Sequence, residues 1–284
     1  MNAIMLLAAI LGVSYQQISK KIYGAKTQNG AYLFSAISSL VAALFFVLSS
    51  GFKFSYSKEV FLYSVLFAVS YGAATLCSFL AIANGPLSLS SLMLSYSTAL
   101  PAVYGVAFLD EKLKTHMVIG LVLLCVSLFF VNYEKSSEKK TITLKWAVFA
   151  FAAFLGNGAC SIVQKVQQIN CDKMYKNEFM IVALLMVSVV LTVAAVVKEK
   201  GSIVTNLRCG FPWYTSCGVA NGLVNLFVLI LATRMPASIM FPLISAGGIV
   251  ASMLVALFVY KEKLSVYQYI GVVLALPSIV LLSI

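Results

Sequence analysis

The sequence predicts an all-α polytopic membrane protein with ten transmembrane helices in two inverted five-helix repeats. Three observations predict this class. Of the 284 residues, 61% are hydrophobic and only 10% are charged, whereas about a quarter of the residues in a soluble domain are charged. The apolar residues form long runs that are separated by short polar stretches. A motif near the middle of the chain occurs again near its end.

Each apolar run has roughly the length that a helix needs to cross a bilayer, about 20 residues. Helices are expected because an open sheet edge would leave unpaired backbone groups in hydrocarbon. A tight turn at Gly85 and Pro86 separates the third run from the fourth. The runs are 3–19, 31–50, 59–81, 87–109, 115–132, 146–168, 178–197, 212–232, 236–259 and 265–283.

The repeated motif becomes visible when the chain is shifted by 151 residues, because segment 109–131 then aligns with segment 260–282. The sequence E-K-L begins at the third residue of both segments, and a glycine and a serine follow at matching places. The matched pairs include Glu111 with Glu262, Gly120 with Gly271, and Ser127 with Ser278.

This offset divides the chain into a first five-helix repeat at 1–134, a polar linker at 135–145 and a second five-helix repeat at 146–284. Five is an odd number of crossings, so the second repeat is expected to enter the membrane in the opposite direction to the first. Inverted repeats of this kind are a feature of secondary transporters, in which the two halves move about a central site.

The two halves resemble the EamA family of the drug/metabolite transporter superfamily, because each ends in E-K-L followed by a helix that carries a glycine. Members of that family also place a glycine midway along the first helix of a half, with a lysine about two turns later. The corresponding segments here are GVSYQQISK from Gly12 to Lys20 and GACSIVQK from Gly158 to Lys165.

The resemblance implies a ten-helix carrier whose central cavity is built mainly by the first, third and fourth helices of each half. The fifth helix of each half is peripheral in the family. Glu111 and Glu262 are therefore expected to be structural, either by capping helix ends or by pairing with nearby lysines. The resemblance also implies a multi-pass protein of the cell membrane with both termini on the same side, in the cytoplasm.

The polar groups expected inside the spans are neutral. All nine acidic residues lie in or beside predicted loops, and a carboxylate at the bilayer centre would cost about 3 kcal/mol. Ser, Thr, Asn, Gln and Tyr instead recur on single helix faces. A single Ser or Thr often serves helix packing, whereas burying an amide is costlier. The expected substrate-binding residues are Tyr15, Gln16, Tyr71, Thr75, Ser95, Tyr96, Asn157, Ser161, Gln164, Lys165, Asn221 and Asn225.

Lys165 lies near the end of its predicted helix, so it either extends to the membrane surface or faces the cavity and meets a substrate carboxylate. Two prolines fall inside the fourth and ninth spans, which are matching helices of the two halves. Each proline removes a backbone hydrogen bond and can bend a helix. We therefore expect Pro101 and Pro242 to act as hinges during opening and closing.

These features predict a secondary active transporter that works by alternating access. Its substrate is expected to be a small neutral or zwitterionic metabolite such as an amino acid, and its other partner is the lipid bilayer. A coupling proton or a counter-substrate is a further candidate. The alternatives are a carrier of nucleotide sugars or lipid-linked sugars, and a carrier of a quaternary amine held by tyrosines.

Other classes find little support in the sequence. The chain has no HExxH motif, no pair of aspartates within a span and no TVGYG pore sequence, which argues against an enzyme and a channel. One histidine, His116, and six scattered cysteines predict no metal site, and no cofactor is expected. The net charge of +11 is attributed to lysines at the membrane surface rather than to nucleic-acid binding.

Overall fold

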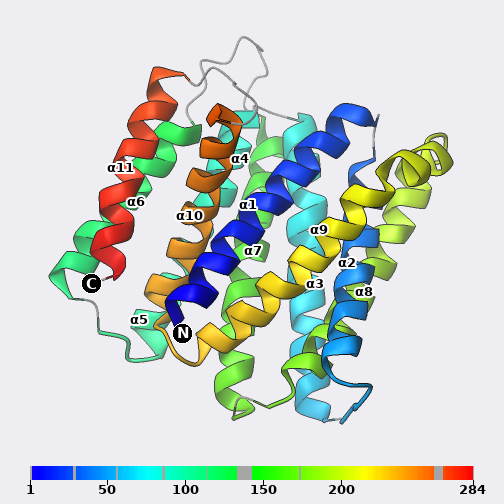
Figure 1. Ribbon diagram of the computed structural model, residues 1–284, viewed down its shortest axis with the longest axis horizontal. Coiled ribbons are helices and arrows are strands. Elements are labelled where there is room, and N and C mark those ends of the chain that lie inside the picture. Colours follow the sequence, from blue (N-terminus) through cyan, green and yellow to red (C-terminus); the bar gives the residue numbers. More distant parts are fainter. Residues whose placement is uncertain are drawn as a thin grey trace. The chain divides into compact units, whose positions relative to one another are not determined.

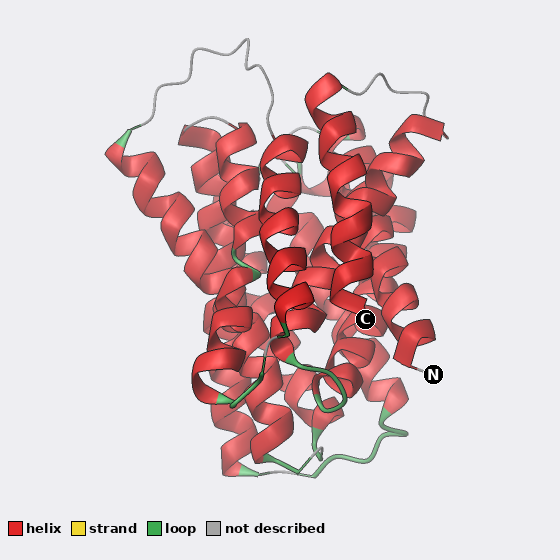
Figure 2. Cartoon of the chain, turned by 90° about the vertical axis from the view of Figure 1, so that its left-hand side faces the viewer, coloured by secondary structure: helices red, strands yellow, loops and turns green. Residues whose placement is uncertain are grey.

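The computed structural model describes residues 2–27, 30–55, 57–84, 87–112, 114–132, 143–172, 174–258 and 265–283. Every regular element within these ranges is an α-helix (Figures 1 and 2). Eight helical segments are long and apolar enough to cross a membrane, which indicates a membrane-spanning protein. The helices are α1 (Asn2–Lys26), α2 (Ala31–Ser49), α3 (Lys58–Asn84), α4 (Leu87–Tyr96), α5 (Ala99–Phe108), α6 (Thr115–Asn132), α7 (Leu144–Asn170), α8 (Lys176–Lys198), α9 (Ile203–Ala232), α10 (Ala237–Phe258) and α11 (Val266–Ser283).

The helices form two compact units. The first unit contains residues 1–72 and 163–233, and the second contains 73–162 and 234–284. Each unit therefore combines helices from the first and the second part of the sequence. Helices α3 and α7 each begin in one unit and end in the other, because the unit boundaries fall inside them.

Two of the predicted spans differ from the observed helices near a proline. The span predicted at 87–109 is interrupted between α4 and α5 at Ser97 and Thr98. Pro101 explains the interruption, because it has no N–H for the carbonyl of Ser97 and its ring crowds that carbonyl. Pro101 is consequently the third residue of α5, where a helix tolerates a missing N–H.

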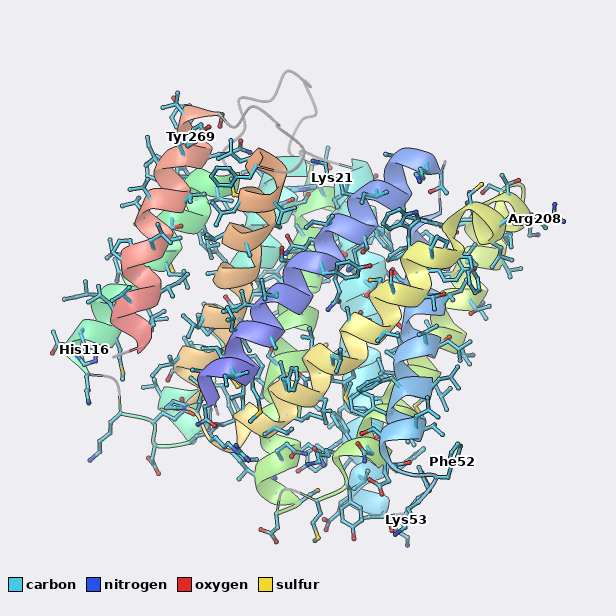
Figure 3. The ribbon with its side chains drawn as sticks, in the orientation of Figure 1. Lys21, Phe52, Lys53, His116, Arg208 and Tyr269 are labelled. Carbon is cyan, nitrogen blue, oxygen red and sulfur yellow. The ribbon has the colours of Figure 1, made fainter. Side chains whose placement is uncertain are left out.

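The prediction that a helix begins at residue 212 was wrong, because α9 begins at Ile203 and passes through Pro212. The nine residues before Pro212 form a helical segment with one buried face. Asn206 and Gly210 are buried, whereas Val204 and Phe211 are exposed. Arg208 projects from the same end of α9 (Figure 3). One turn after the proline, the Ser216 hydroxyl donates a 2.6 Å hydrogen bond to the Pro212 carbonyl.

In the second unit, α6 and α11 lie side by side along their lengths (Figure 1). The Ser127 hydroxyl of α6 donates to the Gly271 carbonyl of α11 at 2.7 Å. The Ser278 hydroxyl of α11 donates to the Gly120 carbonyl of α6 at 2.8 Å. The two bonds are reciprocal, since each helix supplies one donor and one acceptor, and their order along the chain shows that the helices are antiparallel.

The close approach of α6 and α11 depends on their glycines. A methyl group on Gly271 would lie 2.7 Å from the Val131 amide nitrogen and 2.9 Å from the Ser127 carbonyl oxygen. These are backbone atoms, so the helices would have to separate. Glycine at such a position lets two helices come close enough for their hydroxyl–carbonyl bonds to form.

In the first unit, glycines on α9 provide the contact surface for two other helices. Gly210 packs against Tyr23 near the end of α1, and Gly218 and Gly222 pack against Val41 and Phe45 of α2. Helix α2 also contacts α8 on another face, where the buried Ser188 hydroxyl donates to the Ala36 carbonyl at 2.9 Å. Close packing of α1, α2, α8 and α9 follows from these small residues.

Two carboxylates cap helix N-termini from other parts of the chain. Glu199, which follows α8, accepts hydrogen bonds from the amides of Tyr32 and Leu33 in α2 at 2.8 and 3.1 Å. Glu111, which follows α5, accepts from the amides of Ala237 and Ser238 in α10 at 2.6 and 2.9 Å. The first amides of a helix have no partner within it, and a negative charge there is favourable.

Local sequence explains why these distant caps are needed. Gly30 precedes α2 and has no capping side chain, and Pro236 precedes α10. Gly105 gives the Glu111 carboxylate its room, since a methyl group there would overlap it. Glu262, the counterpart of Glu111 in the sequence repeat, lies outside the described residues.

We expect Gly271→Ala to destabilise the protein by about 1–3 kcal/mol, because the added methyl group overpacks the backbone of α6. Gly24→Ala is the matched control, since a methyl group on Gly24 in α1 meets nothing within 4 Å. Melting temperatures of the purified variants in detergent would check the difference. Equal melting temperatures for the two variants would contradict the close contact of α6 and α11.

A pH-dependent stability is expected from Glu199. Burial raises the pKa of the Glu199 carboxyl above its usual 4.5, although its bonds to the amides of Tyr32 and Leu33 oppose the change. The folded protein therefore holds this proton more tightly than the unfolded chain does. The resulting stabilisation is complete below pH 4.5 and is lost as the pH rises through the folded-state pKa.

The test compares the parent protein with Glu199→Gln, which cannot titrate at this position. The melting temperature of the parent, relative to that of the variant, should fall as the pH is raised from about 4 to about 8. A difference that stays constant over this range would show that the carboxyl has the same proton affinity in the folded and unfolded chain.

Candidate functional site

A chain of three bonded amides joins α7 and α9 inside the first unit. The Gln164 Nε2 of α7 donates to the Asn225 Oδ1 of α9 at 2.7 Å. The Asn225 Nδ2 donates in turn to Asn221, both to its Oδ1 at 2.7 Å and to its backbone carbonyl at 2.8 Å. Asn221 and Asn225 are one helical turn apart, so both face α7. Gln164 and Asn221 are each only 6% exposed.

The segment of α7 around Gln164 is rich in buried polar side chains. Lys165 is 7% exposed, and Gln167 and Gln168 are fully buried. The Gln168 Nε2 donates to the Gln167 Oε1 at 2.6 Å. Sequence reasoning missed Gln167 and Gln168, although the run QKVQQIN places several amides together at the end of an apolar helix. That density of amides is the signal from which the pair could have been found.

Three further predicted site residues belong to the first unit but do not bond to the amide chain. Tyr15 is 40% exposed, and Gln16, its neighbour on α1, is half-buried. Tyr71 is half-buried near the middle of α3 and stacks on Phe67, with ring centroids 5.7 Å apart. The structure therefore brings together Gln164, Asn221 and Asn225, with Lys165 beside Gln164 in the sequence.

In the second unit, the predicted site residue Asn157 bonds to the interruption between α4 and α5. Its Nδ2 lies 2.6 Å from the Ser97 Oγ, and the Ser97 hydroxyl donates to the Leu94 carbonyl at 2.6 Å. Gly158 permits the contact, since a methyl group there would lie 2.9 Å from the Ser97 carbonyl oxygen. Asn157 thus donates a hydrogen bond to the Ser97 hydroxyl, which lies at the interruption between α4 and α5.

Other predicted site residues of the second unit form hydrogen bonds with backbone carbonyls of the protein. The Ser95 hydroxyl donates to the Ser91 carbonyl of its own helix at 2.9 Å. The Tyr96 hydroxyl donates to the Cys125 carbonyl of α6 at 2.8 Å. Thr75 and Ser161 are half-buried, and the Thr75 carbonyl accepts from the Ser78 hydroxyl at 2.9 Å. Ser95 and Tyr96 therefore have clear structural roles.

The two candidate hinge prolines have different surroundings. Pro101 follows the interruption of the α4–α5 span, as described above. Pro242 lies inside the continuous helix α10 and is buried. It leaves the Ser238 carbonyl without the N–H that would normally bond to it, while the Ser238 amide and hydroxyl both donate to Glu111.

The described residues contain no group of three His, Cys, Asp or Glu side chains that could hold a metal ion. His116 lies in the first turn of α6, at one end of the second unit (Figure 3). The six cysteines are free and are distributed over several helices.

No protein-family model matches the chain, and no curated protein matches it. The fold is nevertheless shared with a solved structure that is described only as "Crystal structure of protein". The two have a TM-score of 0.79 at 13% sequence identity, and the match covers 99% of this chain and 95% of the other. At this identity the likeness shows the fold alone.

Replacing the central amide, Asn225→Leu, should leave the Gln164 amide and the Asn221 oxygen atoms without their partners. We expect a loss of about 1–3 kcal/mol of stability, because buried polar groups without partners are costly. The double variant Gln164→Leu/Asn225→Leu should recover part of this loss, since it removes both members of one bond. Melting temperatures of the single and double variants would measure the coupling, and strict additivity would contradict it.

Proposed function

We propose that the chain is a secondary active transporter that carries a small neutral or zwitterionic metabolite, such as an amino acid, across the cell membrane by alternating access. One observation carries the proposal: the buried amide chain of Gln164, Asn225 and Asn221 between two apolar helices. Polar side chains inside membrane helices are expensive to bury and are commonly found where a substrate binds.

The arrangement of helices supports a ten-span carrier with inverted repeats. Two shorter apolar helices, Thr115–Val131 and Val266–Leu282, add to the eight long segments. The antiparallel pairing of α6 and α11 through Ser127 and Ser278 is what a pseudo-two-fold axis between reversed halves would produce. These features support a member of the EamA family, with both termini on the cytoplasmic side of the membrane.

The interruption between α4 and α5 supports alternating access. Discontinuous helices are a recurrent feature of transporters, in which unwound backbone borders the site. Pro101 follows the interruption, and Asn157 of α7 bonds to it through Ser97. A change in this hydrogen bond would let α5 change its angle to α4, and Pro101 and Pro242 are the proposed hinges. A coupling proton or a counter-substrate would drive the cycle.

The alternative substrates fit the polar groups less well. A nucleotide sugar or lipid-linked sugar carries phosphates, which call for several fixed cations, whereas the buried groups near Gln164 are mainly amides. A quaternary amine would need a cage of aromatic rings, but the Tyr96 hydroxyl is bonded to α6. Lys165 favours a substrate that carries a carboxylate.

The test is uptake into proteoliposomes that contain the purified protein. Labelled amino acids, nucleosides, sugars and quaternary amines would be offered separately over a range of concentrations. A carrier should show uptake of one class that saturates and that is accelerated by the same unlabelled solute inside the vesicles. Uptake that rises without saturation would indicate a channel, and the absence of uptake in all classes would refute the proposal.

In the same assay we expect Pro101→Ala to lower the rate of uptake, because a restored hydrogen bond would stiffen the interruption. Pro212→Ala in α9 is the matched control, since that helix is continuous on both sides of its proline. Parent-like rates for Pro101→Ala would remove Pro101 as a hinge.

A further inference from the structure

We infer that the amide chain of Gln164, Asn225 and Asn221 has one fixed direction, with a free donor at Asn221 and a free acceptor at Gln164. These two residues would then determine specificity, and the solute would need both an acceptor group such as a carboxylate and a donor group such as an ammonium. The inference rests on the proposed function and narrows its substrate class.

The direction of the chain follows from a single backbone carbonyl. Asn225 contacts the carbonyl oxygen of Asn221 at 2.8 Å, and a carbonyl can only accept a hydrogen bond. The contacting atom of Asn225 must therefore be its NH₂ group. Without such an anchor, the oxygen and nitrogen of an amide could be exchanged without violating the geometry.

Fixing Asn225 also fixes its two neighbours. The Asn225 oxygen is an acceptor, so Gln164 must face it with its NH₂ group, at 2.7 Å. The Asn225 NH₂ group also faces Asn221 at 2.7 Å, so Asn221 must present its oxygen. The remaining atoms are the Gln164 Oε1, which is an acceptor, and the Asn221 Nδ2, which is a donor.

Both remaining atoms are free within the described part of the chain, since neither has a hydrogen-bond partner there. Each belongs to a side chain that is more than nine-tenths buried. Neither is among the fully enclosed unpaired atoms of the described residues, which are Ser19 Oγ, Tyr23 Oη, Ser39 Oγ, His116 Nε2 and Asn177 Oδ1. Each of the two free atoms therefore keeps some accessible surface.

A solute that pairs with both free atoms must carry one hydrogen-bond acceptor and one hydrogen-bond donor. A carboxylate can accept from the Asn221 amide, and an ammonium can donate to the Gln164 oxygen. A solute that lacks one of these groups leaves one end of the amide chain unpaired. Sites that hydrogen-bond a substrate reject analogues without the matching group far more strongly than apolar pockets reject an extra methylene.

The test measures binding to the purified protein by titration calorimetry. The probes are L-alanine and 4-aminobutanoate, which carry both groups, and butylamine and butanoate, which carry one each. The parent protein should bind at least one amino acid probe about tenfold or more tightly than either single-group probe. The two amino acids differ in the separation of their charged groups, so their order reports the distance between the two free ends.

Asn221→Asp tests the assigned direction. Aspartate keeps the oxygen that accepts from Asn225 but replaces the free donor with an acceptor. The ratio of affinities for 4-aminobutanoate and 1,4-diaminobutane should shift about tenfold or more toward the diamine. Gln17→Glu is the matched control, because it adds the same charge at an exposed position of α1 in the same unit and should leave the ratio unchanged.

Asn221→Leu removes the donor without adding a charge. It should abolish the preference for 4-aminobutanoate over butylamine. Both readouts are ratios of affinities, so a general loss of folded protein does not mimic them.

Two results would overturn the inference. One is an Asn221→Asp variant whose ratio of affinities for 4-aminobutanoate and 1,4-diaminobutane equals that of the parent. The other is a parent protein that binds neither L-alanine nor 4-aminobutanoate more tightly than the single-group probes. The proposed function would survive that result if the proteoliposomes show saturable uptake of a sugar or nucleoside. It would fail separately if no class of solute is taken up.

Discussion

The absence of water from a bilayer governs how the polar groups of this chain are arranged. A polar group inside an apolar helix can be satisfied only by another part of the protein. Here that requirement is met between helices as well as within them. Ser127 and Ser278 bond to glycine carbonyls on each other's helix, and Glu111 and Glu199 supply acceptors to helix ends that have no capping side chain of their own.

The same requirement separates structural polar residues from candidate site residues. Ser95 and Thr98 donate to carbonyls three or four residues earlier in the chain. Their hydroxyl donors therefore have acceptors in the same segment and do not require a ligand. Amides are different because each has a donor and an acceptor at opposite sides of one carbon. Three amides in series satisfy one another inside the chain and still leave one donor and one acceptor at its ends.

The positions of the helices could be predicted from the sequence because the apolar runs are long and their separators are polar. Two differences between the predicted spans and the observed helices occurred near prolines. The eighth apolar run was predicted to begin at residue 212, but α9 begins at Ile203 and passes through Pro212, because the residues before it have their own buried face of Asn206 and Gly210. Pro101 was recognised as a point of bending, but the sequence did not show that the helix would be interrupted four residues earlier.

The candidate site was predictable as a set of residue types and not as a set of contacts. Gln164, Asn221 and Asn225 stood out because amides are costly in apolar helices. Their pairing depends on how α7 lies against α9. The spacing of residues along one helix does not predict which residues of another helix it contacts. Glu199 was overlooked because its position in a charged stretch resembles a solvated loop, whereas α2 needs its carboxylate at Gly30. Ser95 and Tyr96 were selected for their polarity, yet they bond to carbonyls of the protein.

The reciprocal contact of α6 and α11 has a consequence for shorter versions of this molecule. Gly120 and Ser127 in α6 occupy the same relative places as Gly271 and Ser278 in α11, so the face of α6 is complementary to a reversed copy of itself. A polypeptide ending at Asn132 would retain a donor and an acceptor on one surface. Two such fragments could associate in antiparallel orientation through an isologous interface, without α11.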